Sequence, residues 1–198
     1  MDNQEELEFI RRVLDGEHAA YAFLVDRYKG MAFSIAVKIL GNEEDAQDVA
    51  QEGFIKAYQQ LHQFEGKSKF STWLYTIVYR TALAKAKEAK VKTFSITQQF
   101  KETFTDDYST PQLKLMQADD EQRSVNQAVN KLSKTDALIV ILYYIDDNSI
   151  REIRQITGMS VANIKIRLFR ARKKLERELK FLLDDNTSES KAYGKQGR

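Results

Sequence analysis

Aromatic, basic and hydroxyl side chains alternate in the segment that covers residues 64–87. Aromatic rings stack on exposed nucleic-acid bases and cationic side chains follow phosphates, so this combination suits an unpaired strand. On a helix, Trp73, Thr76 and Arg80 would share one stripe beside the core-facing side. The alternative for Trp73 is an ordinary packing role, because tryptophan is usually half-buried. The residues predicted to contact a strand are Lys67, Lys69, Phe70, Ser71, Thr72, Trp73, Thr76, Arg80 and Lys87.

A second segment, residues 160–182, separates an apolar stripe from a basic face. Apolar side chains recur every three or four residues from Val161 to Leu182, which predicts a helix packed on one side. On the other face, Asn163 can pair with a base edge, Ile166 can contact a thymine methyl group, and the following basic residues can neutralise phosphates. The alternative is a solvated basic face on a helical hairpin. The predicted DNA contacts are Ser160, Ala162, Asn163, Ile166, Arg167, Arg170, Lys173, Lys174 and Arg177.

The second segment follows a short capped helix. Ser149 and Glu152 have the spacing of a capping box, which satisfies the free amides at a helix start. Gly158 permits a left-handed turn after that helix, and Ser160 can cap the next one. Helix, short turn and helix together predict a DNA-binding helix-turn-helix.

Four helices are predicted before residue 92, and the first is a short one marked by Leu7, Ile10 and Leu14. Gly41 ends one helix, Asn42 caps the next, and Ser71 is predicted to cap the one after it. The helix after Asn42 has a buried stripe made of Ala46, Val49, Ala50, Gly53, Phe54, Ala57 and Leu61. Its other side carries Asp45, Asp48, Gln51, Glu52 and Ile55. Carboxylates at this spacing could hold a metal ion, but without a histidine partner a solvated or partner-facing surface is the preferred interpretation.

The predicted fold class is all-α, with two small helical domains joined by a flexible linker. The first domain covers residues 1–92 and the second covers residues 123–183. Residues 93–122 hold the single proline, Pro111, and many polar side chains, so they are predicted to be the linker. Residues 184–198 are predicted to be a polar tail.

Charge is segregated along the 198 residues, although the formal net charge is only +2. Residues 1–66 hold 13 acidic and 6 basic side chains, whereas residues 67–92 hold 1 and 7. Residues 93–150 hold 9 acidic and 5 basic side chains, whereas residues 151–181 hold 3 and 10. Two basic blocks in an acidic frame indicate two contacts with a polyanion and an acidic surface for another partner.

Several function classes are excluded by composition. The chain has no cysteine, its histidines (His18 and His62) lie in separate segments, and it has no glycine loop that could bind phosphate. We therefore expect no enzyme activity, no cofactor, no metal and no small-molecule substrate. The N-terminus is acidic and no apolar run approaches ~18 residues, so we expect a cytoplasmic protein without direct membrane insertion.

Both halves resemble regions of bacterial RNA polymerase sigma factors of the extracytoplasmic-function (ECF) group. Residues 41–58 (GNEEDAQDVAQEGFIKAY) and 70–77 (FSTWLYTI) are similar to region 2. Residues 132–134, 158–161 and 167–175 (RLFRARKKL) are similar to region 4. The order and spacing of these motifs and the linker match as well, so the resemblance covers nearly the whole chain except the tail.

The resemblance implies a specificity subunit of RNA polymerase. Residues 45–58 would dock on the coiled coil of the largest core subunit through Asp45, Asp48, Gln51, Glu52 and Ile55. Residues 64–87 would bind the −10 promoter element and capture a flipped base, and the helix-turn-helix would read the −35 element. An anti-sigma factor is a further partner that the resemblance suggests.

The chain departs from the family pattern at Arg80, Ala84, Arg154, Ile166 and Phe169. A conventional helix-turn-helix regulator, which binds duplex DNA without polymerase, is the alternative function. It would leave the acidic helix and the Trp73 segment without a role.

Overall fold

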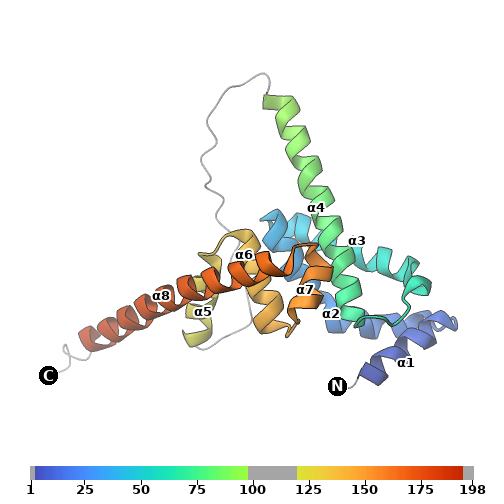
Figure 1. Ribbon diagram of the computed structural model, residues 1–198, viewed down its shortest axis with the longest axis horizontal. Coiled ribbons are helices and arrows are strands. Elements are labelled where there is room, and N and C mark those ends of the chain that lie inside the picture. The colour runs from blue at the N-terminus through green and yellow to red at the C-terminus, as the bar shows by residue number, and fades with distance from the viewer. Residues whose placement is uncertain (1–2, 98–119, 194–198) are drawn as a thin grey trace.

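The computed structural model describes residues 3–97 and 120–193, and every regular element in these two ranges is helical (Figure 1). The all-α prediction is therefore confirmed. The elements are α1 (Asn3–Leu14), η1 (His18–Ala20), α2 (Tyr21–Leu40), α3 (Glu43–Gln59), η2 (Leu61–Gln63), α4 (Phe70–Thr97), α5 (Asp120–Asn130), α6 (Lys134–Val140), η3 (Ile141–Ile145), α7 (Ile150–Thr157) and α8 (Val161–Tyr193).

Local signals define the junction between α2 and α3. Gly41 follows α2 in the left-handed conformation, with φ of 90°. The Asn42 side chain then accepts a hydrogen bond from the Asp45 backbone N–H at 2.8 Å, as predicted for a helix cap. Helix α4 differs from the prediction, because it begins at Phe70 and places Ser71 inside its first turn.

The first half of the described chain packs α2, α3 and α4 against one another. Helix α3 comes closest to α4 at Gly53, where an added Cβ would lie 2.7 Å from a methyl carbon of Val78. The stripe predicted for α3 is buried throughout its length, including the residue that continues it into η2. It consists of Ala46, Val49, Ala50, Gly53, Phe54, Ala57 and Leu61.

The second half forms the predicted helix-turn-helix. Ser149 and Glu152 make both hydrogen bonds of the capping box that opens α7. Gly158 closes α7 with φ of 73°, and the Ser160 hydroxyl accepts from the Asn163 N–H at 3.2 Å at the start of α8. Helices α5 and α6 support this pair, and α6 continues into η3, a π-helical turn.

The two halves share one apolar core. Helix α7 packs against α4, and α6 packs against α2 (Figure 1). Polar contacts cross the same junction, where the Lys38 ammonium group donates to the Asn130 side-chain oxygen at 2.6 Å. Burial lowers the pKa of Lys38. The described chain thus forms one body, from which the last turns of α4 and α8 project in different directions (Figure 1).

Three helices extend beyond the predicted boundaries. Helix α5 begins at Asp120, three residues before the predicted start of the second domain at 123. Helix α4 continues to Thr97, five residues past the boundary at 92, and α8 continues to Tyr193, into the segment predicted as a tail. Residues 98–119 of the predicted linker, including Pro111, lie outside the described residues.

Candidate nucleic-acid interface

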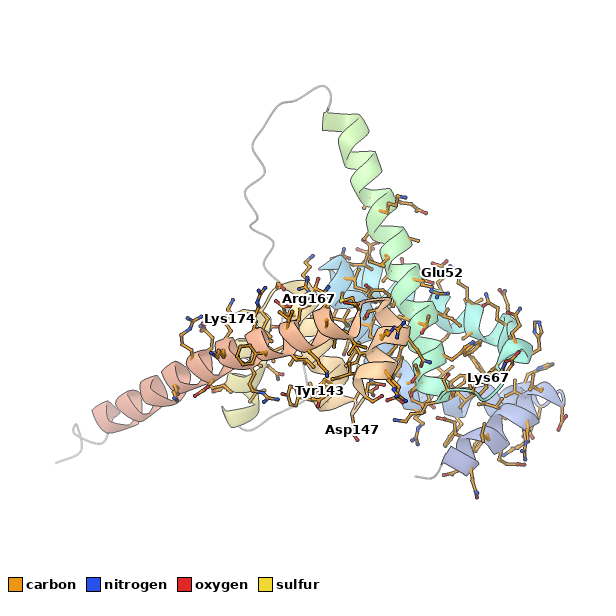
Figure 2. The ribbon with its side chains drawn as sticks, in the orientation of Figure 1. Glu52, Lys67, Tyr143, Asp147, Arg167 and Lys174 are labelled. Carbon is orange, nitrogen blue, oxygen red and sulfur yellow. The ribbon has the colours of Figure 1, made fainter. Side chains whose placement is uncertain are left out.

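The basic face of α8 is directed away from the core. Its apolar stripe is buried at Ile164, Leu168 and Ala171, which fixes the rotation of the helix. The predicted contacts that lie exposed on the other side are Ser160, Ala162, Asn163, Ile166, Arg170, Lys173 and Arg177. Arg167 and Lys174 are half-buried and already have partners within the chain, the Asp136 carboxylate and the Lys131 carbonyl (Figure 2).

Two large apolar side chains on this face are exposed to solvent. Ile166 is 50% exposed and Phe169, three residues further on, is 60% exposed. The Lys173 ammonium group lies 4.8 Å from the centre of the Phe169 ring. The sequence prediction included Ile166 but not Phe169 as a contact. The i, i+3 spacing of these two residues is the signal that could have identified Phe169.

The predicted strand-binding segment is partly accessible. Lys67, Lys69, Arg80 and Lys87 are exposed, and Ser71, Trp73 and Thr76 are half-buried. Lys67 lies in the loop before α4 and is paired with Glu65 (Figure 2). Lys69 is ion-paired with Glu152 of α7 at 3.0 Å.

Three aromatic rings support the start of α4. The ring centres of Phe64, Phe70 and Trp73 lie 5.5 to 5.7 Å from one another. Phe70 is buried, so in this arrangement it packs beneath the surface. Thr72 is buried as well, and its hydroxyl has no hydrogen-bond partner within the described residues. It lies three residues from both Lys69, which directly precedes α4, and Tyr75 of α4, and both of these contact the second half.

The junction beside Thr72 contains two half-buried carboxylates, Asp146 and Glu152. The Tyr75 hydroxyl donates to Asp146 at 3.2 Å, and burial raises the pKa of Asp146 above its ordinary value. Burial alone would raise the pKa of Glu152 too, but hydrogen bonds from Ser149 and Lys69 outweigh it and lower that pKa. The folded protein therefore keeps Glu152 ionised next to Lys69.

The acidic face of α3 carries the five residues predicted to bind a protein partner. Asp48, Gln51, Glu52 and Ile55 are exposed, and Ile55 is 50% exposed although it is apolar. Asp45 is half-buried between Asn42 and Lys85, and their hydrogen bonds lower its pKa. Glu52 projects from α3 and pairs with Lys56 at 2.7 Å (Figure 2).

An apolar groove of about 1060 Å³ runs beside that face, between α2 and α3. Gln51 and Ile55 line it together with α2 residues that include Val25 and Phe33. On the α3 side, the Tyr58 hydroxyl lies 2.6 Å from Nδ1 of His18. The sequence prediction missed the α2 wall, although Val25 and Phe33 are apolar residues away from the core-facing stripe of their helix.

The described residues contain neither a cluster suited to a metal ion nor a membrane-spanning helix. Within residues 3–97 and 120–193, no three acidic or histidine side chains lie close enough together to hold a metal ion. None of the helices in the same ranges combines the length and apolar character needed to cross a bilayer.

Both halves of the chain match known sequence families. Residues 24–90 match the family model of Sigma-70 region 2, and residues 122–175 match that of Sigma-70, region 4. The ECF RNA polymerase sigma factor SigW of Bacillus subtilis (strain 168) is 30% identical over 179 residues, covering 87% of this chain and 96% of that protein. The RNA polymerase sigma-H factor of Pseudomonas aeruginosa is 29% identical over 189 residues, covering 92% and 98%.

A solved structure has the same fold. It is the sigma factor RpoE in complex with the anti-sigma factor NepR from Bartonella quintana, with a TM-score of 0.62 and 21% identity. The likeness covers 81% of this chain and 96% of that one. The shared arrangement therefore includes helices from both halves.

Proposed function

This chain belongs to the ECF group of RNA polymerase sigma factors, with sigma-70 regions 2 and 4, and from this premise we propose which surface meets each partner. As a sigma factor it directs RNA polymerase to promoters and acts in transcription initiation, and it is not an enzyme. The sigma-factor family replaces the alternative of a conventional helix-turn-helix regulator, because residues 24–90 match Sigma-70 region 2 and residues 122–175 match region 4. The observation that carries the assignment of surfaces is that exposed basic residues lie on α8, on α4 and in the loop before α4, whereas exposed acidic residues lie on α3.

The proposed polymerase-binding surface combines the acidic face of α3 with the groove beside it. An exposed isoleucine next to carboxylates is typical of a protein interface, where an apolar centre is surrounded by a polar rim. The groove is apolar and open between two helices, which suits a helical partner laid along it. The residues assigned to this surface are Asp45, Asp48, Gln51, Glu52 and Ile55.

Charge reversal tests this surface. We expect Glu52→Lys or Asp48→Lys to weaken binding of the full-length protein to core polymerase by about tenfold, because an attractive contact becomes repulsive. Asp15→Lys makes the same change of charge at an exposed position after α1 and is the control. Fluorescence titration with labelled protein measures the affinity for core polymerase. If Asp15→Lys lowered this affinity as much as the α3 variants do, the assignment of the surface to α3 would be contradicted.

The proposed −10 surface is the start of α4 and its preceding loop. Trp73 is half-buried on Phe64 and Phe70, so a rigid ring is held at the surface and can stack on an unpaired base. We assign Phe70 the supporting position beneath Trp73, and we expect Thr72 to contact DNA only after α7 moves away. The residues assigned to this surface are Lys67, Lys69, Phe70, Ser71, Thr72, Trp73, Thr76, Arg80 and Lys87.

The proposed −35 surface is the exposed face of α8. Its N-terminal residues can reach base edges in the major groove, and the basic residues further along can meet phosphates. The residues assigned to it are Ser160, Ala162, Asn163, Ile166, Arg167, Arg170, Lys173, Lys174 and Arg177.

Run-off transcription on a library of genomic fragments tests all three surfaces together. We expect the full-length protein and core polymerase to start transcripts at promoters that share one pair of −10 and −35 sequences. Core polymerase alone is the control. Starts at unrelated sequences, or at the same sites without the protein, would contradict the proposal.

We further propose the cytoplasm as the site of action, since the protein must meet polymerase and DNA there. An anti-sigma factor is a proposed partner, because the RpoE structure with the same fold is a complex with one.

A further inference from the structure

Arg167 is held in place by two other side chains of region 4. Its Nε donates to Oδ1 of Asn163 at 3.1 Å, and its Nη1 donates to Oδ1 of Asp136 at 2.8 Å. The side chains of Arg167 and Asp136 are only 33% and 24% exposed. This arginine is therefore anchored inside the domain.

The anchor is itself rigid. Asp136 lies in the first turn of α6, where its second carboxylate oxygen accepts from the Ser133 hydroxyl at 2.7 Å. Its backbone N–H donates to the same hydroxyl at 3.2 Å. Helices α6 and α8 pack through the shared core, so their relative position is fixed. Asp136 thus holds Arg167 from a separate helix that does not carry the −35 face.

Two other basic residues of this face, Arg170 and Lys173, differ from Arg167. Arg170 is exposed and makes no ion pair or side-chain hydrogen bond with the part of the chain that the structure describes. Within the described part of the chain, Lys173 interacts only with the Phe169 ring. Both are available to phosphates, whereas Arg167 is held against its own domain.

We propose that Arg167 is a positioning residue that fixes Asn163 with its amide nitrogen toward DNA, so that Asn163 reads base acceptors. This inference rests on the proposed function of α8 in the major groove. Because the Asn163 oxygen accepts from Arg167, the two Nδ2 hydrogens are left to face the base. The usual asparagine pairing with adenine needs that oxygen as an acceptor for the adenine amino group.

The expected base preference follows from the groove edges. Guanine presents two acceptors, N7 and O6, and is the best match for an outward amide group. Cytosine presents an amino donor in the major groove and is the worst match. We therefore expect guanine to be favoured at the base opposite Asn163, and the preference to depend on Arg167 and Asp136.

The test uses full-length protein in holoenzyme and a promoter library with a randomised −35 element. We expect Asn163→Ala and Arg167→Ala to relax the preference by about tenfold at the same single position, which is the size of one bidentate contact. In the Asn163→Ala background, Arg167→Ala should relax it no further. Arg170→Ala is the matched control and should weaken binding evenly on all sequences.

Asp136→Asn is a second test of the proposal, measured as base preference in the same promoter library. Loss of a negative charge near DNA would by itself strengthen binding to every sequence. The proposal instead predicts relaxed preference at the position that Asn163 reads. Helical content by circular dichroism verifies that each variant is folded.

Two results would overturn the inference in different ways. If Arg167→Ala weakens binding evenly, as Arg170→Ala does, Arg167 is a phosphate contact and the proposed function of α8 stands. If Asn163→Ala alters no base preference at all, both the inference and the proposed −35 readout by Asn163 are wrong.

Discussion

At the scale of single residues, Glu152 takes part in two interactions, one within its own helix and one between the two regions. It accepts a hydrogen bond from the Ser149 backbone N–H at 2.7 Å, which completes the cap of α7. It also pairs at 3.0 Å with Lys69, the residue directly before α4, which joins region 4 to region 2. Because these donors lower its pKa below the ordinary 4.5, the folded protein favours the ionised form.

This residue gives the fold an acid-sensitive component. A depressed pKa adds stability above about pH 4.5, and that stability is lost as the pH falls through the folded-state pKa. Glu152→Gln removes the charge but keeps a residue that can complete the capping box. We expect Glu152→Gln to be less stable than the parent near neutral pH, and the difference to shrink as the pH falls below about 4.5.

Thermal unfolding followed by circular dichroism across this range measures the difference. Glu176→Gln changes the same charge at an exposed position of α8 and is the control. If the difference in thermal stability between Glu152→Gln and the parent stayed constant with pH, the ionised carboxylate of Glu152 would not be the source of the acid-sensitive stability.

Among the elements, α3 and α4 depend on a glycine for their close approach. A Cβ at position 53 would lie 2.7 Å from Cγ2 of Val78, too close for an ordinary contact. Helix propensity alone would favour alanine at that position by about 1 kcal/mol. Overpacking a core typically costs about 1–3 kcal/mol, so the clash should outweigh the gain in propensity.

We therefore expect Gly53→Ala to lower the free energy of unfolding by up to about 2 kcal/mol, measured by urea denaturation. Gly30→Ala is the matched control, since Gly30 lies inside α2 with no heavy atom within 4 Å of an added Cβ. It should stabilise the protein by about 0.5–1 kcal/mol. Gly53→Ala should cost less in a Val78→Ala background, and a stabilising Gly53→Ala would contradict the packing argument.

Features with local causes could be predicted at this scale. The Asn42 cap, the capping box of α7 and the stripe of α3 depend on residues within a few positions of one another, and all are confirmed. The burial of Phe70 and Thr72 could not be predicted, because it depends on neighbouring aromatic rings and on packing with other elements.

The candidate site shows the same division between local and distant causes. The exposed face of α8 followed from its apolar stripe, whereas the partner of Arg167 lies 31 residues earlier in the chain. The α2 wall of the groove likewise depends on how α2 and α3 pack. Sequence periodicity describes one helix at a time, so contacts between helices could not be predicted from it.

At the scale of the whole molecule, the two basic blocks, residues 67–92 and 151–181, lie on elements that pack against each other, although they are far apart in the sequence. The first block contacts region 4 through the ion pair of Lys69 with Glu152 at 3.0 Å. The basic face of α8 follows α7 directly, and from Ser160 to Arg177 it spans roughly 25 Å at ~1.5 Å per residue. Both proposed DNA surfaces therefore lie within a few tens of ångströms of each other.

Promoter geometry is incompatible with this arrangement. The −10 and −35 elements are about 25 base pairs apart, or roughly 85 Å of B-form DNA at ~3.4 Å per base pair. If the proposed surfaces bind these two elements, regions 2 and 4 must separate before both elements are bound. The buried Thr72 hydroxyl is consistent with such a change, because an unpaired buried hydroxyl costs about 1–3 kcal/mol and would regain a partner on exposure.

A reversible cross-link across the junction tests whether opening is required. The chain has no cysteine, so Leu40→Cys with Lys134→Cys introduces two unique thiols where α2 and α6 meet, one at a half-buried and one at an exposed position. Neither residue belongs to a proposed DNA or polymerase surface. A short bis-maleimide that contains a disulfide would then hold regions 2 and 4 together.

We expect the cross-linked protein to lose at least about tenfold in promoter-specific transcription, because only one promoter element can be reached at a time. Reduction of the linker should restore the activity of the double variant, and each single-cysteine variant treated with the reagent serves as a control. Binding to core polymerase, measured in parallel, distinguishes lost docking from lost promoter contact. Full transcription by the cross-linked protein would mean that the junction between α2 and α6 stays closed during initiation, and that the two DNA surfaces reach their elements by another movement.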